Sequence, residues 1–255
     1  MSSHLLPVFA HNATLELEEH LPNVLNGSAS LVEALFCCEQ YRIKAIAGLL
    51  LTAESELFHW NLHKSARLWS FFLSQLSETV KVSSKSAPFF DGIVCQDLSV
   101  SIQIAANSRR TWNSTEEYED DFLYVNFLME KFFHEAPDFK QIQIVEQYGQ
   151  VLDGMEDPRF DVCSAFANHL PIEFESALFH LLDAQETRMN RMRALEVVLP
   201  EVAIQATVNV EAAGLCVLAR SLGWITPEDV PALPSLIFSP ASIDYSDTAW
   251  QDPHS

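Results

Sequence analysis

Three side chains in one stretch of the chain have the types and spacing of a metal site. Glu56, His59 and His63 occupy positions i, i+3 and i+7, which lie close to one face of a helix. Two histidines four residues apart have the spacing of a helical zinc pair, and Glu-x-x-His is the repeated unit of carboxylate-bridged di-metal bundles. The chemistry would be that of a metal-dependent helical enzyme.

The rest of either metal pattern is missing. The zinc motif needs a glutamate directly after the first histidine, where this chain has Trp60. A di-metal bundle needs a second Glu-x-x-His on another helix, and Glu56 and His59 form the only one in the sequence. The chain also has no Gly-x-Ser-x-Gly elbow, P-loop or Gly-x-Gly-x-x-Gly. We therefore predict no metal site, no cofactor and no catalytic residue.

A second group of side chains is dense in negative charge. Five carboxylates occur within six residues, in what we call the acidic segment. Acids at a helix start stabilise it by about 0.3–1 kcal/mol each, but two or three satisfy that preference and five repel one another. The excess favours a surface for a cationic partner, with a tyrosine as an amphipathic anchor. The predicted partner-binding residues are Glu116, Glu117, Tyr118, Glu119, Asp120 and Asp121.

The whole chain shares this charge bias. Its 255 residues contain 35 Asp and Glu against 15 Lys and Arg, a net charge of −20. Such a charge disfavours binding to nucleic acid or to an anionic membrane, and it suits a basic protein partner. No Lys or Arg precedes Arg42 or follows Arg220, so both ends are purely acidic.

The cysteines and the N-terminus indicate the compartment. The cysteine count is five, which is odd, and no CxxC spacing occurs, so we expect reduced thiols rather than disulfides. The first residues lack a basic region and a long apolar run, which a secretory signal requires. We therefore expect a cytoplasmic protein.

Apolar residues recur at helical spacing through most of the chain. Only seven glycines occur, which disfavours folds that need many tight turns. We expect an all-α fold: a single domain of packed antiparallel helical hairpins, with a solenoid-like arrangement left open. Residues 1–240 form this domain and 241–255 an acidic tail, on which Tyr245 and Trp250 could still dock. The expected helices cover residues 30–53, 54–80, 98–106, 115–134, 139–152, 160–169, 173–198 and 202–222.

Local signals refine two of these regions. Ser114 and Glu117 fit a capping box that opens the helix of residues 115–134. Residues 81–92 are rich in serine and contain Pro88 and Asp91-Gly92, so we expect a loop there. A short capped turn is expected at residues 226–229.

Three segments, in this order, resemble a known family. They are Tyr118-Glu-Asp-Asp-Phe-Leu-Tyr124 with Leu128, Phe174-Glu-Ser-Ala-Leu178 with Leu181-Leu182, and Glu211-Ala-Ala-Gly-Leu215 followed by Leu218-Ala-Arg220, Gly223, Leu233-Pro234 and Leu236. Together they resemble the all-helical immunity family forty-nine of bacterial polymorphic toxin systems, over about residues 116–238.

The resemblance implies that the chain binds and neutralises a cognate protein toxin, protecting the cell that makes it. It supplies no catalytic residues. An acidic inhibitor of this kind could occupy the basic groove of a nuclease toxin. Two alternatives stay open: a helical-repeat adaptor with a peptide groove, and a metal-dependent enzyme using Glu56, His59 and His63.

Overall fold

The computed structural model describes residues 5–194, 204, 207–225, 230–239 and 243–254. Within these ranges the chain is built from helices and turns and contains no strand, so the predicted all-α fold class is confirmed. The α-helices are α1 (Leu6–Leu25), α2 (Leu31–Thr52), α3 (Ser55–Gln75), α4 (Ala87–Val94), α5 (Leu98–Asn107), α6 (Glu119–Phe132), α7 (Asp138–Leu152), α8 (Pro158–Ala167), α9 (Pro171–Ala194) and α11 (Val210–Ser221).

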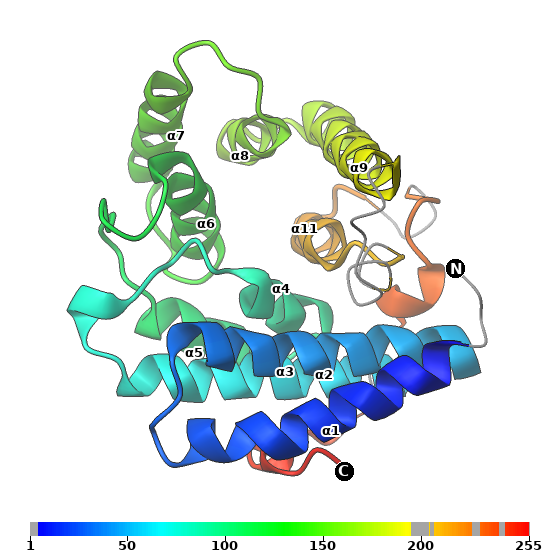
Figure 1. The fold of residues 1–255 in the computed structure, drawn as a ribbon. Coiled ribbons are helices and arrows are strands. Elements are labelled where there is room, and N and C mark those ends of the chain that lie inside the picture. The colour runs from blue at the N-terminus through cyan, green and yellow to red at the C-terminus, as the bar shows by residue number, and fades with distance from the viewer. Residues whose placement is uncertain (1–4, 195–203, 205–206, 226–229, 240–242, 255) are drawn as a thin grey trace.

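Helices α1, α2 and α3 form one layer of antiparallel hairpins (Figure 1). The Ser30 side chain accepts a hydrogen bond from the Glu33 backbone and starts α2, and Ala53 ends it with a left-handed backbone, φ 55°. Helix α1 was not among the predicted helices. Its buried side chains nevertheless follow a helical stripe that packs on α2, and they are Leu6, Phe9, Ala13, Leu17, Leu21 and Val24.

The predicted loop at residues 81–92 is wrong in its second half, because α4 begins at Ala87. Pro88 lies in the first turn of α4, where proline's missing N–H costs nothing. Asp91 is fully buried and paired with Arg42. Gly92 allows close packing, since a Cβ there would lie 2.8 Å from Oγ of Ser101 on α5. Pro88, Asp91 and Gly92 are typical of turns, but in this fold they are part of the packed helix α4.

The predicted capping box at Ser114 is also wrong. Residues 114–117 form a turn, and α6 begins at Glu119 with Tyr118 as the N-cap, which makes no side-chain capping bond. The apolar stretch Phe122–Met129 is buried, as its composition predicts. The helix therefore has a solvated start and a buried body.

Helices α6 to α9 and α11 form an arch over the first layer (Figure 1). The segments α6–α7 and α8–α9 pair as hairpins, and α11 packs on α4. Of the helix predicted at 202–222, the structure describes α11, which begins at Val210. The Asn209 side chain caps it by accepting a hydrogen bond from the Ala212 N–H. The end of the helix predicted at 173–198 and the turn predicted at 226–229 lie outside the described residues.

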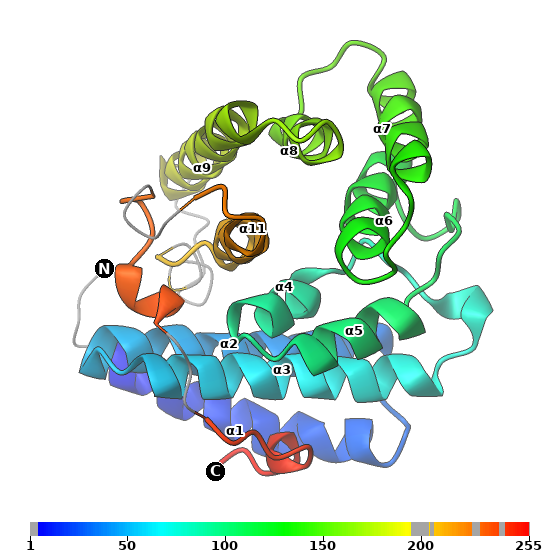
Figure 2. The same cartoon turned by 180° about the vertical axis from the view of Figure 1, so that it is seen from behind.

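The last described residues run across α3 and α1 (Figure 2). The Tyr245 ring stacks on His63, with centroids 4.2 Å apart, and its hydroxyl donates to the Cys95 carbonyl at 2.7 Å. Trp250 is buried, and its carbonyl accepts from the Tyr41 hydroxyl at 2.5 Å. Both aromatic residues of the acidic C-terminal segment are therefore docked on the helices.

All five cysteines are free, in line with the expectation of reduced thiols, and all five are buried. Burial raises the pKa of each thiol and keeps it protonated, which makes it a poor nucleophile and metal ligand. Their structural role is that of small apolar side chains. They are Cys37, Cys38, Cys95, Cys163 and Cys216.

Candidate functional site

Three carboxylates of the acidic segment are used inside the molecule. Glu117 accepts hydrogen bonds from the backbone N–H groups of Ser84, at 2.8 Å, and Asn113, at 3.2 Å. Asp121 forms an ion pair with Arg159, with Oδ1 and Nη1 2.7 Å apart. Glu119 accepts from the Gln147 side chain at 2.8 Å. These contacts attach the segment to the 81–86 loop, α8 and α7.

The other members of the acidic segment face outward. Tyr118 is 79% exposed, although large aromatic side chains usually bury more of their surface. Glu116 is exposed and Asp120 is half-buried, and neither carboxylate has an ion pair or hydrogen bond with the part of the chain that the structure describes. This surface retains negative charge beside an exposed aromatic ring.

The structure separates Glu56 from the two histidines. Glu56 is exposed, whereas His59 and His63 are completely buried. His59 Nε2 donates to the carbonyl of Ile237 at 2.8 Å, and burial lowers the pKa of His59. His63 Nδ1 lies 3.0 Å from Asp97, under the stacked ring of Tyr245. The two histidines fix the chain after α11 against α3.

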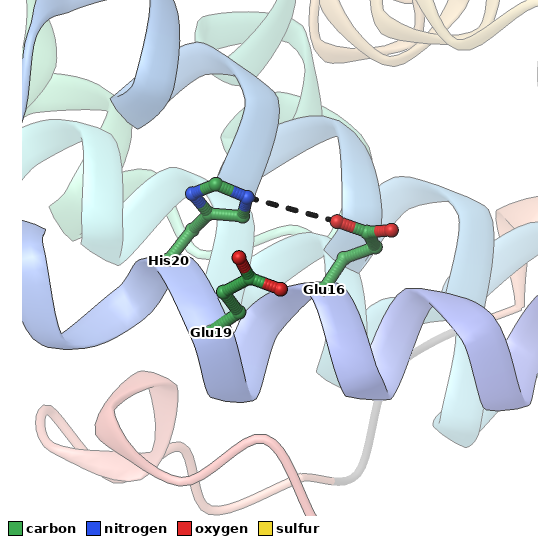
Figure 3. Close-up of side chains that lie close together, drawn as sticks. All are labelled: Glu16, Glu19 and His20. Atoms are coloured by element: carbon green, nitrogen blue, oxygen red, sulfur yellow. Dashed lines mark ion pairs between the residues drawn. The ribbon is translucent and has the colours of Figure 1, made fainter.

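Among the described residues, a different group has the geometry of a metal site. Ligand atoms of Glu16, Glu19 and His20 on α1 lie within 4.8 Å of one another (Figure 3). Both His20 nitrogens already have partners, since Nδ1 lies 3.0 Å from Glu33 and Nε2 3.7 Å from Glu16. The hydrogen bond with Glu33 raises the pKa of His20, which favours the protonated form over the neutral imidazole that a metal requires. This group is an ion-pair network at the α1–α2 surface.

A pocket of about 540 Å³ lies where the first layer meets the arch. Its lining comes from α2, the 84–87 loop, α4, α6, α8, α9 and the start of α11, so elements far apart in sequence build it. The volume is in the range of small-molecule sites. The charged lining residues are Glu39, Arg42, Lys85, Asp121, Arg159 and Glu211.

The two arginines of the pocket are neutralised by neighbouring carboxylates. Arg42 donates to both oxygens of Asp91, at 2.8 and 2.7 Å. Burial opposes the charge of Arg42, but Asp91 outweighs that cost and raises the Arg42 pKa. Arg159 pairs with Asp121 at 2.7 Å and Asp157 at 3.1 Å. The donors of both guanidinium groups are therefore largely occupied.

Two other groups in the pocket lack such partners. Tyr124 is 2% exposed, and its buried hydroxyl has no hydrogen-bond partner in the described structure. Glu211, half-buried in the first turn of α11, forms no ion pair with any described residue. The Tyr124 hydroxyl is near enough to lower the Glu211 pKa, but burial is the larger effect and raises it. The pocket thus holds a carboxylate that has no cationic partner among the described residues, beside a buried phenol hydroxyl that interacts with it.

The pocket and the acidic segment are contiguous. Asp121 belongs to both, and Glu117 bonds to Ser84, which also lines the pocket. Sequence reasoning placed the acidic segment but missed the pocket. The one signal in the sequence was Glu211, the single acid of a mainly apolar helix and the first residue of one segment of the family resemblance.

Comparison with curated proteins and with solved structures yields no match. The sequence does match the family described as Immunity protein 49, over residues 11–237. This range includes the acidic segment and every lining residue of the pocket named above. The expected family resemblance is therefore confirmed, and over more of the chain than the three segments cover. The chain belongs to the Immunity protein 49 family.

Proposed function

We propose that this protein binds a cognate bacterial toxin in the cytoplasm and neutralises it. The observation that carries the proposal is the family match over residues 11–237, which spans most of the fold rather than one motif. Membership implies the role of an inhibitor, not of an enzyme. The separation of Glu56 from His59 and His63 supports that role, because it removes the metal-binding arrangement that their spacing offered.

The toxin's binding surface is proposed to be basic. Glu116, Tyr118 and Asp120 provide charge and an aromatic anchor that the fold itself does not use. Charge complementarity of this kind speeds the encounter of two proteins. A nuclease with a basic substrate groove fits this description, and the inhibitor could cover that groove. No described helix is both long and apolar enough to cross a bilayer.

Co-expression with a candidate toxin, encoded next to the gene for this protein, tests the function. The toxin alone should stop growth, and this protein supplied in the same cell should restore it. A catalytically inactive toxin variant should co-purify with the protein as a stable complex. Continued growth arrest, with no complex at micromolar concentrations, would refute the proposal for that toxin.

A matched pair of variants tests the surface separately. Glu119→Lys with Asp120→Lys reverses two charges at the start of α6, whereas Glu173→Lys with Glu175→Lys reverses two exposed charges near the start of α9. Both pairs change the net charge equally, and each removes first-turn acids from a helix: two in α6 and one, Glu173, in α9. Only the α6 pair should reduce protection. Equal loss in both would indicate a general charge effect and place the interface elsewhere.

A further inference from the structure

The pocket beside the acidic segment has an unbalanced set of hydrogen-bonding groups. Its arginines are occupied by Asp91, Asp121 and Asp157. Glu211 has no cationic partner among the described residues, and the Tyr124 hydroxyl beside it is buried. A carboxylate only accepts hydrogen bonds, and the donors that stabilise it most are those that carry positive charge.

Glu211 is not explained by its place in the helix. A carboxylate in the first turn is stabilised by the helix dipole, which lowers its pKa. Here the pKa of Glu211 is raised, because burial outweighs the favourable effects of Tyr124 and Arg159. A carboxylate without an ion pair in such a place costs stability, and a bound cation would recover that cost. The position is therefore suited to a ligand.

The remaining lining sets the shape of that ligand. Apolar walls are provided by Leu35, Phe90, Val125, Met189 and Val208. The Tyr124 ring lies between Phe90, with centroids 6.2 Å apart, and the Arg159 guanidinium at 5.4 Å. A cation on a short alkyl stem matches this combination, since the stem would pack on the walls while its charged end meets Glu211.

We infer that the pocket binds the cationic end of a lysine or arginine side chain, presented by the basic surface of the protein partner, with the Glu211 carboxylate and the Tyr124 hydroxyl as its acceptors. The contiguity with the acidic segment supports this occupant: a basic surface attracted by Glu116 and Asp120 reaches the pocket at Asp121. The preference of the pocket for a cation does not depend on the proposed function. The identification of that cation as a side chain of the toxin does.

An anion is the main competitor for the pocket. The N-terminus of α11 and Lys85 would favour one, and Lys85 is exposed at the pocket. Against this, Glu39 and Glu211 also line the pocket, and both guanidinium groups already hold carboxylates. The two ligand classes can be separated with small probes.

Saturation-transfer NMR on the full chain, with n-butylguanidinium and n-butyrate as probes, tests the pocket without the toxin. At about pH 8, the cation should bind with millimolar affinity and butyrate should not. Glu211→Gln should weaken cation binding at least about tenfold. It should remain folded by circular dichroism, with an equal or higher Tm, because it removes a half-buried charge that has no ion pair. Tyr124→Phe should weaken binding about threefold.

The matched control is Lys85→Gln, which removes a pocket charge of the opposite sign. It should keep or strengthen cation binding. Binding of butyrate instead of the cation, or cation binding unchanged in Glu211→Gln, would overturn the inference. If Glu211→Gln loses the small cation but holds the toxin with an unchanged dissociation rate, the partner's side chain is not the occupant, while the proposed function stands.

Discussion

The acidic segment and the pocket both contain carboxylates, but the fold treats them differently. In the segment, Glu116 and Asp120 face solvent and Glu117 is used for internal hydrogen bonds. In the pocket, Glu211 is partly buried without an ion pair, and its pKa is raised. The acidic segment can be recognised in the sequence because its charges are consecutive. The pocket forms only when helices that are distant in sequence pack together.

This difference separates two contributions to binding. Exposed charges act over distance, change the encounter rate and are screened by salt. A half-buried carboxylate acts at contact, where it selects the group that pairs with it and controls dissociation. The two regions adjoin at Asp121, so one basic partner surface could engage both.

The largest effect is expected at the ion pair between Asp91 and Arg42, the latter of which lines the pocket. Asp91→Ala removes the carboxylate that pairs with Arg42 and accepts from Ser65, leaving a buried guanidinium without its partner. Loss of about 3–5 kcal/mol from the free energy of unfolding is expected. Urea denaturation measures it. Asp120→Ala should stay within about 0.5 kcal/mol of wild type, because this half-buried carboxylate has no ion pair or hydrogen bond with a described residue, and similar losses in the two variants would contradict the distinction between the two acids.

A smaller effect should divide the acidic segment itself. Glu117→Ala leaves two backbone N–H groups, of Ser84 and Asn113, without their acceptor, and it should cost about 1–3 kcal/mol. Glu116→Ala removes an exposed carboxylate and should change the free energy of unfolding by less than about 0.5 kcal/mol. Urea denaturation of both variants in the same buffer measures the two changes in the free energy of unfolding. A stable Glu117→Ala would show that the turn at residues 114–117 does not depend on this side chain.

The smallest effect concerns pH. Because the pKa of Glu211 is raised in the folded protein, the folded state binds this proton more tightly than the unfolded state. Ionisation therefore costs stability as pH rises from the ordinary glutamate value of about 4.5 through the folded pKa. Glu211→Gln should lose this contribution, so its stability relative to wild type should increase with pH across that window. A relative stability that stays flat or falls would mean that the carboxylate is satisfied in the fold.

The sequence predicts the helical fold well because helical apolar spacing reports burial directly. The prediction fails where a residue type that is common in turns or caps makes a tertiary contact instead. Pro88 and Gly92 signal a turn, but tertiary packing places one in the first turn of α4 and the other against Ser101. Ser114 and Glu117 match a capping box, yet Glu117 reaches across to Ser84 and α6 starts later.

The candidate site likewise has one part that the sequence reveals and one part that it does not. The acidic segment is visible in sequence because its charges are consecutive. The pocket is invisible, since Arg42, Tyr124, Arg159 and Glu211 have no regular spacing and meet only in the folded chain. Likewise, the spacing of Glu56 and His59 implied one face, but packing buries the histidine and leaves the glutamate in solvent.

The most direct test of the account is the pair of rate constants for toxin binding, measured at low and high salt. Three proteins are compared: wild type, Glu119→Lys with Asp120→Lys, and Glu211→Gln. The α6 charge reversal should lower the association rate and flatten its salt dependence, with little change in dissociation. Glu211→Gln should raise the dissociation rate about tenfold and change association less than about twofold. Association rates unchanged by the charge reversal at both salt concentrations would contradict the role of the acidic segment, and an unchanged dissociation rate in Glu211→Gln would contradict that of the pocket.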